Sequence, residues 1–236
     1  MTFSSINPAT GELLARFDAL TEAELEARLA RAERAAHSWG RLDVAQRTVV
    51  LARAAELLDD RSQEYGRLLT SEMGKTFRSA LEEVAKCALA LRYYADNAAR
   101  FLAPQRVSDE TEGGGEVHFE PLGPILAIMP WNFPFWQVVR FAAPALAAGN
   151  VALLKHASNV PQCALALERL FLEAGAPEGV FQALLLPADR IAGLIADERV
   201  RGVTLTGSER AGRAVAAAAG QHLKKTVLEL GGSDPF

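Results

Sequence analysis

Two short motifs place residues suited to carbonyl chemistry directly after apolar segments. Residues 130–134 read PWNFP, so Asn132 lies in a rigid turn where its amide N–H can donate to an oxygen that gains negative charge. Residues 229–232 read ELGG, which puts Glu229, a candidate general base, beside two glycines that let a ligand approach the backbone. An isolated Asn is more often a turn cap, and an isolated Glu is more often solvated or ion-paired. Whether Asn132 and Glu229 are catalytic therefore depends on the motifs that accompany them in the rest of the chain.

Two further positions suit a nucleotide. Lys155 ends an apolar run, where its ammonium can meet ribose hydroxyls or a ribose phosphate, although a surface lysine is the alternative. Residues 206–208 read TGS and open a helical pattern, and the free N–H groups of a helix N-terminus favour a pyrophosphate. The GxGxxG motif is absent, which argues against an ordinary Rossmann dehydrogenase.

Arg140 is the only charged residue between positions 133 and 148. It follows Asn132 by eight positions, about two helical turns, so both side chains can face one cleft. A guanidinium there can hold the far carboxylate of a short semialdehyde in a bidentate pair. The alternative is an arginine that pairs with a structural carboxylate.

The elements that must position these residues alternate between strand and helix. Strands are expected at 125–129, 151–154, 180–185, 203–205 and 226–228. Helices are expected to begin near Pro134, Pro161, Ala188 and Ser208, with Gly149 and Gly175 as C-terminal stops. This alternation predicts an α/β fold with a doubly wound parallel sheet, in which ligands bind at the carboxyl ends of the strands.

Three parts of the chain are expected to differ in structure. Residues 1–103 are predicted to be a helical part, with helices opened by the Thr21/Glu24 and Asp43/Gln46 capping pairs. Residues 104–122 are predicted to be a β-hairpin around the glycines at 113–115. This hairpin either contacts another subunit or folds back on its own sheet. Residues 123–236 are the predicted nucleotide-binding part.

Composition narrows the possible partners. Half of the 236 residues are hydrophobic and the formal net charge is −4, so no overall basic field attracts nucleic acid or anionic lipid. A basic-then-apolar leader and an apolar run of 18 residues are both absent, so we expect a cytoplasmic protein without a membrane partner. Cys87 and Cys163 lack metal-ligand spacing and are interpreted as buried apolar residues, so no metal site is predicted.

Taken in order, PWNFP, Lys155, TGS and ELGG resemble the aldehyde dehydrogenase superfamily over essentially the whole chain, and most of all its succinate-semialdehyde dehydrogenases. The resemblance implies a Rossmann-like domain that binds NAD or NADP, with Asn132 in the oxyanion hole and Glu229 as the base. Arg140 matches an arginine of the succinate-semialdehyde enzymes. The implied cofactor-binding residues are Met129, Pro130, Trp131, Lys155, Ser158, Gly207, Ser208, Leu230 and Gly231.

Two departures from the family pattern affect the cofactor. Many relatives that prefer NAD carry a glutamate at the position of Ser158, and without that carboxylate a 2′-phosphate is not repelled. The residue at this position is therefore compatible with NADP as well as with NAD. The turn after Leu186 lacks the glycine that many relatives have beside the adenine.

The family's nucleophilic cysteine comes some tens of residues after ELGG, beyond Phe236. We therefore expect this chain to be half of an enzyme that oxidises an aldehyde, and the aldehyde that we expect is succinic semialdehyde. The reaction would pass through a thiohemiacetal and a thioester on a cysteine that this chain lacks. We expect the chain alone to be inactive and the complete enzyme to be a homo-oligomer. The alternatives are an inactive nucleotide-binding or subunit-association module, and a CoA-acylating aldehyde dehydrogenase, against which Glu229 argues.

Overall fold

A five-stranded parallel sheet forms the centre of the protein. The computed structural model describes residues 2–107 and 114–233. The strand order is β7-β6-β5-β8-β9. The strands are β5 (Pro124–Met129), β6 (Val151–His156), β7 (Phe181–Ala183), β8 (Gly202–Thr206) and β9 (Lys225–Glu229). The prediction of a doubly wound parallel sheet is confirmed, and all five predicted strands are present.

The helices that connect these strands begin and end close to the predicted residues. They are α5 (Trp136–Ala147), α6 (Pro161–Glu173), the short η1 (Ala188–Arg190) with α7 (Ile191–Ala196), and α8 (Glu209–Gln221). Pro161 is in the first turn of α6, where no N–H is needed. Gly149 and Gly175 follow α5 and α6 with φ of 89° and 97°, a conformation that glycine adopts without steric cost.

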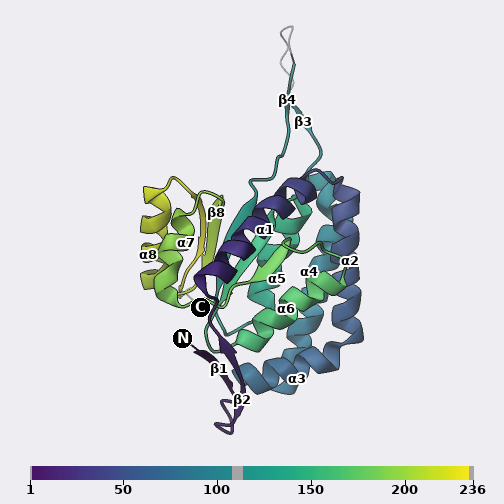
Figure 1. Ribbon diagram of the computed structural model, residues 1–236. Coiled ribbons are helices and arrows are strands. Elements are labelled where there is room, and N and C mark those ends of the chain that lie inside the picture. The colour runs from purple at the N-terminus through teal and green to yellow at the C-terminus, as the bar shows by residue number, and fades with distance from the viewer. Residues whose placement is uncertain (1, 108–113, 234–236) are drawn as a thin grey trace.

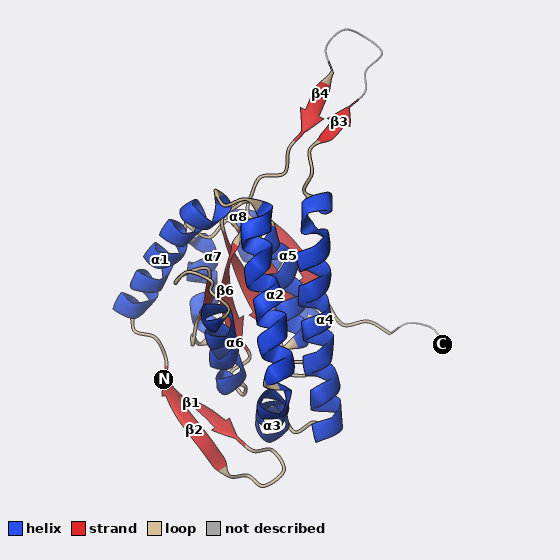
Figure 2. Cartoon of the chain, turned by 90° about the vertical axis from the view of Figure 1, so that its right-hand side faces the viewer, coloured by secondary structure: helices blue, strands red, loops and turns tan. Residues whose placement is uncertain are grey.

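Four helices precede the central sheet: α1 (Glu22–Gly40), α2 (Val44–Asp60), α3 (Ser62–Met73) and α4 (Phe77–Phe101). Both predicted capping boxes are present, at Thr21/Glu24 and at Asp43/Gln46. Helix α1 lies on one side of the strands, and α2 and α4 lie on the other (Figure 2). On that second side α4 packs on α5, and α2 and α3 contact α6. The apolar faces of all these elements share one core.

The first residues of the chain differ from the expected helical part. β1 (Thr2–Ile6) and β2 (Leu13–Asp18) form an antiparallel hairpin, so the prediction of helix is wrong before Glu22. Phe3 and Ser5 point into the protein, at 4% and 0% exposure. The hydroxyl of Ser5 accepts a hydrogen bond from the Gln162 side chain at 2.9 Å. A buried serine in place of an apolar residue hides the alternation that would mark a strand.

The hairpin that was predicted at residues 104–122 is present and projects from the body of the protein (Figure 1). Its strands are β3 (Gln105–Val107) and β4 (Gly115–Val117), and all of their residues are exposed. Gly115 pairs with Val107 in the ladder, so it belongs to the strand and not to the turn as predicted. Gly113 lies outside the described residues.

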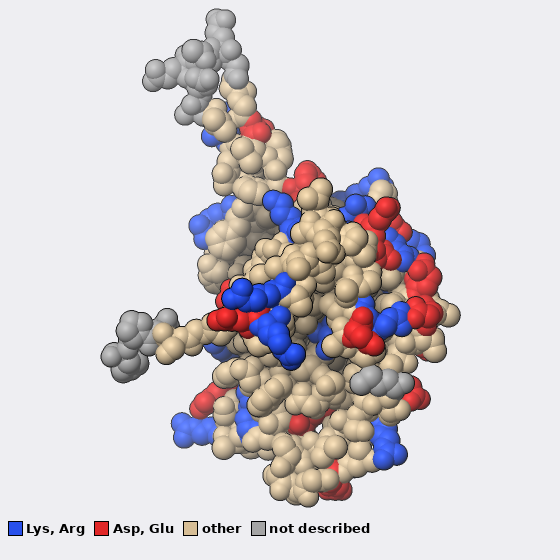
Figure 3. Space-filling model, turned by 90° about the vertical axis from the view of Figure 1, so that its left-hand side faces the viewer, with Lys and Arg blue, Asp and Glu red and all other residues tan. Residues whose placement is uncertain are grey.

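The face of the protein that Figure 3 shows is largely uncharged, with scattered positive and negative side chains and no large patch of one sign. On α8, Arg213 lies 3.6 Å from Glu209, one turn earlier. Within residues 2–107 and 114–233, no helix is both long enough and apolar enough to cross a membrane.

Candidate active site

The strand register brings the candidate residues to one edge of the sheet. Ile128 pairs with Lys155 on one side and with Leu205 on the other, and Thr206 pairs with Glu229. The loop after β5 that contains Asn132 (residues 130–134, the Asn132 loop) begins one residue beyond Met129. Because all five strands are parallel, the Asn132 loop, Lys155, the TGS segment and Glu229 all lie at the carboxyl edge.

The side chain of Asn132 is oriented by its own backbone. Its Oδ1 accepts a hydrogen bond from the N–H of Phe133 at 3.1 Å. A backbone N–H can only donate, so the atom that faces it is the oxygen, and the Nδ2 group points away. The residue is exposed. Asn132 is thus placed as a hydrogen-bond donor at the surface of the carboxyl edge.

His156, at the end of β6, is hydrogen-bonded to the last residue of the Asn132 loop. Its Nε2 donates to the carbonyl of Pro134 at 2.9 Å, and its Nδ1 accepts from the N–H of Ala157 at 2.9 Å. These two partners fit only the neutral ring that is protonated at Nε2. Burial lowers the pKa of His156 to about 4, because the charged ring would be desolvated.

Two charged residues that the sequence analysis did not single out lie where this loop joins α5. Glu83 accepts hydrogen bonds from the start of α5, and Lys75 pairs with Glu83. A signal was present in the sequence, because Glu83 lies at helical spacing between Ala80 and Cys87, on the apolar face of its helix. A carboxylate on the buried face of a helix needs a partner.

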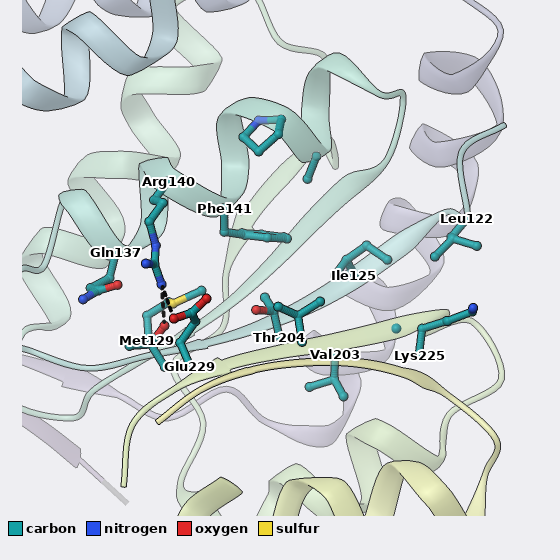
Figure 4. A pocket seen from close by; sticks show the side chains of 15 residues that line it. Leu122, Ile125, Met129, Gln137, Arg140, Phe141, Val203, Thr204, Lys225 and Glu229 are labelled. Carbon is teal, nitrogen blue, oxygen red and sulfur yellow. Dashed lines mark hydrogen bonds and ion pairs between the residues drawn. The ribbon is translucent and has the colours of Figure 1, made fainter. Parts of the chain in front are cut away.

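A cavity of about 400 Å³ lies between α5 and the strands β5, β8 and β9 (Figure 4). Its polar groups include Gln137, Arg140, Thr206 and Glu229. The Nη2 of Arg140 lies 3.8 Å from the Oε2 of Glu229 and 3.4 Å from the Oγ1 of Thr206. Apolar side chains such as Met129, Phe141 and Val203 form much of the remaining wall. The cavity thus combines an apolar body with the guanidinium of Arg140 and the carboxylate of Glu229 at one end, and the ammonium of Lys225 at the start of β9.

The expected relation between Asn132 and Arg140 holds only in part. Helix α5 begins at Trp136, so the eight intervening positions are not two helical turns. Arg140 and Glu229 line the cavity, whereas Asn132 is not one of its lining residues. The capping by Glu83 explains the late start of the helix, because its carboxylate binds the N–H groups of Phe135 and Trp136.

Of the residues expected to bind the nucleotide, Lys155 is half-buried and Ser158 is exposed. Burial lowers the pKa of the Lys155 ammonium. The Oγ of Ser208 caps α8 by accepting from the N–H of Ala211 at 3.3 Å, and Gly207 donates its N–H to the carbonyl of Glu229 at 3.0 Å. The TGS segment is therefore fixed against the end of β9.

The remaining expected cofactor residues lie around the same edge but differ in exposure. Trp131 is 49% exposed and Leu230 is 43% exposed, and Gly231 is exposed as well. Pro130 is half-buried. Met129 is 4% exposed, and it contributes to the wall of the cavity.

Both cysteines are free and have 0% exposure. Burial raises the pKa of the Cys87 and Cys163 thiols well above the usual value, so their nucleophilic thiolate form is disfavoured. Neither thiol can act on a substrate in the folded chain. Among the described residues, no group of three or more histidine, cysteine or acidic side chains is arranged to hold a metal ion.

The chain is similar to known proteins along its whole length. A protein of Synechocystis named as a probable NADP(+)-dependent succinate-semialdehyde dehydrogenase is 52% identical over 236 residues, which is 100% of this chain and 52% of the relative. Succinate-semialdehyde dehydrogenase [NADP(+)] 1 of Mycobacterium tuberculosis is 49% identical over 238 residues, again 100% of this chain and 52% of the relative. The chain therefore spans about half the length of the curated relatives it matches.

The chain is also similar to a solved structure of about twice its length. The succinic semialdehyde dehydrogenase of Streptococcus pyogenes in complex with NADP+ superimposes with a TM-score of 0.95 and 41% identity, over 98% of this chain and 51% of that one. The family model for the aldehyde dehydrogenase family matches residues 1–236. The chain belongs to the aldehyde dehydrogenase family.

Proposed function

We propose that this chain is the cofactor-binding half of an NAD(P)-dependent aldehyde dehydrogenase that oxidises succinic semialdehyde. The observation that carries the proposal is the cavity in which Arg140 and Glu229 lie together at the carboxyl edge. An aldehyde with a distant carboxylate needs a cation to bind its far end and a base for the release of the acid. The names of the similar Synechocystis, Mycobacterium and Streptococcus proteins support this substrate.

In this proposal the chain supplies two of the groups that act on the carbonyl carbon. The Nδ2 of Asn132 donates to the oxygen when a thiolate from the other half of the protein adds to the aldehyde. After a hydride has left this adduct and so made it a thioester, Glu229 removes a proton from the water that attacks the thioester, which releases the acid and frees the thiol. When bound, the nicotinamide accepts the hydride.

Arg140 can exchange one carboxylate for another. Its contact with Glu229 is 3.8 Å long, and the two side chains are 40% and 55% exposed, so this ion pair is weak. A substrate carboxylate that entered the cavity would form shorter, bidentate hydrogen bonds with the guanidinium. Glu229 would then be free to serve as the base.

For the cofactor, we propose NADP in preference to NAD. Lys155 provides a cation at the end of β6, and Ser158 does not repel a 2′-phosphate. Gly207 and Ser208 offer the N-terminus of α8 to the pyrophosphate. Trp131, Leu230 and Gly231 would line the nicotinamide end, with Met129 and Pro130 beneath it. The printed names of the similar Synechocystis and Mycobacterium proteins specify NADP(+).

Calorimetric titration of this chain with NADP+ and NAD+ tests the cofactor assignment. We expect NADP+ to bind more tightly, and Lys155→Met to weaken NADP+ binding by about 10-fold or more, because a charged hydrogen bond contributes about 1.5–3 kcal/mol. Lys225→Met is the matched control, because Lys225 begins β9 at the opposite edge of the sheet. If neither nucleotide binds at millimolar concentration, the cofactor assignment fails.

A fusion of residues 1–236 to the second half of the Synechocystis relative tests the substrate. We expect Arg140→Leu to raise the KM for succinic semialdehyde about 10- to 100-fold and to leave the KM for butanal nearly unchanged. Equal effects on the two aldehydes would exclude Arg140 as the carboxylate ligand.

The same fusion separates the alternatives. Formation of succinate without added CoA supports hydrolysis, whereas turnover that requires CoA supports an acylating enzyme. A fusion that binds the cofactor but oxidises no aldehyde would leave the chain as a nucleotide-binding module only.

We also propose that the β3-β4 hairpin joins copies of the complete enzyme into a homo-oligomer. Val107 and Val117 are 55% and 44% exposed on strands that project from the body. Exposed apolar strands are ready partners for another chain. Light scattering of the fusion should give a multiple of the subunit mass, and Val107→Lys together with Val117→Lys should reduce that mass. A monomeric parent fusion would contradict the proposal.

A further inference from the structure

Glu83 is a buried carboxylate that lies directly beneath the Asn132 loop. It belongs to α4, is 3% exposed, and is not part of the cavity. Its Oε1 accepts hydrogen bonds from the N–H of Phe135 and from the N–H of Trp136, both at 2.9 Å. These are the first N–H groups of α5, which have no acceptor within the helix. Glu83 therefore fixes the end of the loop three residues after Asn132.

Lys75 binds the same loop from the turn between α3 and α4. Its Nζ pairs with the Oε2 of Glu83, and the two side chains are 9% and 1% exposed. The same Nζ lies 4.1 Å from the centroid of the Phe133 ring, in a cation–π contact. The ion pair thus contacts the residue directly after Asn132 as well as the start of α5.

The charge on Glu83 matters as well as its shape. A carboxylate accepts from two N–H groups and from the Lys75 ammonium without presenting a donor to any of them. A glutamine at this position would turn an amide NH2 toward an ammonium or toward a backbone N–H. Both arrangements set donor against donor, and a buried donor without an acceptor is costly.

Glu72 offers an internal comparison. It is 2% exposed and caps α6, accepting from Gln162 N–H at 2.9 Å and from Cys163 N–H at 2.7 Å. It has the same chemistry, the same burial and the same number of backbone donors as Glu83. The two differ in position, because Glu72 serves the loop after β6 and Glu83 serves the loop that carries Asn132. They also differ in partners, because both oxygens of Glu72 accept from the backbone, whereas Glu83 uses Oε1 for the backbone and Oε2 for Lys75.

We propose that the Lys75–Glu83 ion pair is the positioning device that holds the Asn132 loop and so aims the Nδ2 of Asn132 at the reacting oxygen. This proposal rests on the proposed function, because Asn132 needs to be aimed only if a carbonyl reacts beside it. Glu83 and Lys75 act through the loop and do not touch the substrate. An oxyanion donor that is fixed in advance needs no reorganisation when the charge develops.

Nitrogen-15 relaxation of the asparagine side-chain amides tests the positioning in this chain without any activity. In the parent chain we expect the Asn132 amide to be ordered. In Glu83→Gln we expect its order parameter to fall below about 0.6, the range of flexible groups. In Glu72→Gln it should stay at the parent value. Asn150, whose Oδ1 accepts from Leu122 and Gly123 at the opposite edge of the sheet, reports that each variant is folded.

A second variant keeps the test decisive if Glu83→Gln does not fold. Lys75→Met combined with Glu83→Gln removes both charges, so no buried charge is left alone, and an amide oxygen remains to cap α5. Here too we expect a more mobile Asn132. An Asn132 amide as ordered as in the parent, in either folded variant, would overturn the proposal.

The fusion enzyme gives the functional readout. Glu83→Gln should lower kcat about tenfold or more while the KM for NADP+ stays unchanged, because a small displacement of a catalytic group is costly to the rate. Glu83→Asp, which keeps the charge, should restore part of kcat. An unchanged kcat with a mobile Asn132 would contradict the proposed role of Asn132, whereas an ordered Asn132 with a lowered kcat would contradict the positioning by Glu83.

Discussion

The two sides of the carboxyl edge differ in how their segments are held. The loops after β5 and β6 are bound by Glu83, Glu72 and His156, none of which is more than 5% exposed. On the other side, β9 is the last strand of the sheet in the part of the chain that the structure describes, where it pairs with β8, and Val227 is 60% exposed. Glu229 at the end of β9 has a side chain that is 55% exposed.

This difference separates the part of the site that is fixed within this chain from the part that is open. Strands of parallel sheets are normally buried on both faces. β9 therefore has a face that is exposed in this chain, and in the fusion proposed above the second half would be expected to cover it. We expect substitutions on the β5–β6 side to affect the stability of this chain alone. Substitutions on β9 should have their larger effect in the fusion enzyme, where that strand would be covered.

The largest expected effect is on stability. Leu153 in β6 has 0% exposure, and Leu153→Ala should lower the free energy of unfolding by about 2–5 kcal/mol, since it removes buried atoms and leaves a cavity. Val227→Ala should cost about 0.5 kcal/mol or less, as for other surface substitutions. Urea unfolding followed by circular dichroism measures both. Similar losses for the two variants would show that β9 is as well packed as β6.

The next effect concerns the two catalytic candidates, which lie on different sides of the edge. In the fusion enzyme, Asn132→Ala should slow the first burst of reduced cofactor by about 10²–10³, because it removes an oxyanion donor. Glu229→Gln should leave that burst intact and slow the steady-state rate, because the base acts after hydride transfer. Stopped-flow absorbance separates the two phases. A slow burst in both variants would assign Glu229 to the first step.

Much of the fold follows from local sequence. The five strands, the capping boxes and the stops at Gly149 and Gly175 depend on neighbouring residues, and all of them were predicted correctly. The β1-β2 hairpin was missed because Ser5 is satisfied by Gln162, which is 157 positions away. A partner at that distance leaves no mark in the local pattern.

The site was less predictable than the fold, since its contacts join distant segments. The motifs identify Asn132 and Glu229 as residue types, but the pairing of Arg140 with Glu229 depends on β9 lying beside β8. The contact of Glu83 with Phe135 spans 52 positions. Only the tertiary arrangement shows that a charge on α4 binds the loop after β5.

The smallest expected effect of the three tests the β5–β6 side through pH. His156 has a usual pKa of 6.5 and a pKa of about 4 in the folded chain, so the unfolded chain takes up the proton first as the pH falls. The stability contributed by the neutral ring is complete above about pH 6.5 and is lost progressively down to about pH 4. Between pH 7 and pH 5 this loss amounts to about 2 kcal/mol.

Urea unfolding of the parent chain should show this loss of stability, and His156→Gln should remove that part of the pH dependence. His37→Gln is the control, because His37 is exposed on α1. If the pH dependence of His156→Gln matches that of the parent, the ring of His156 is not held neutral beneath Pro134, and the contrast between the two sides of the edge would rest on the two buried carboxylates alone.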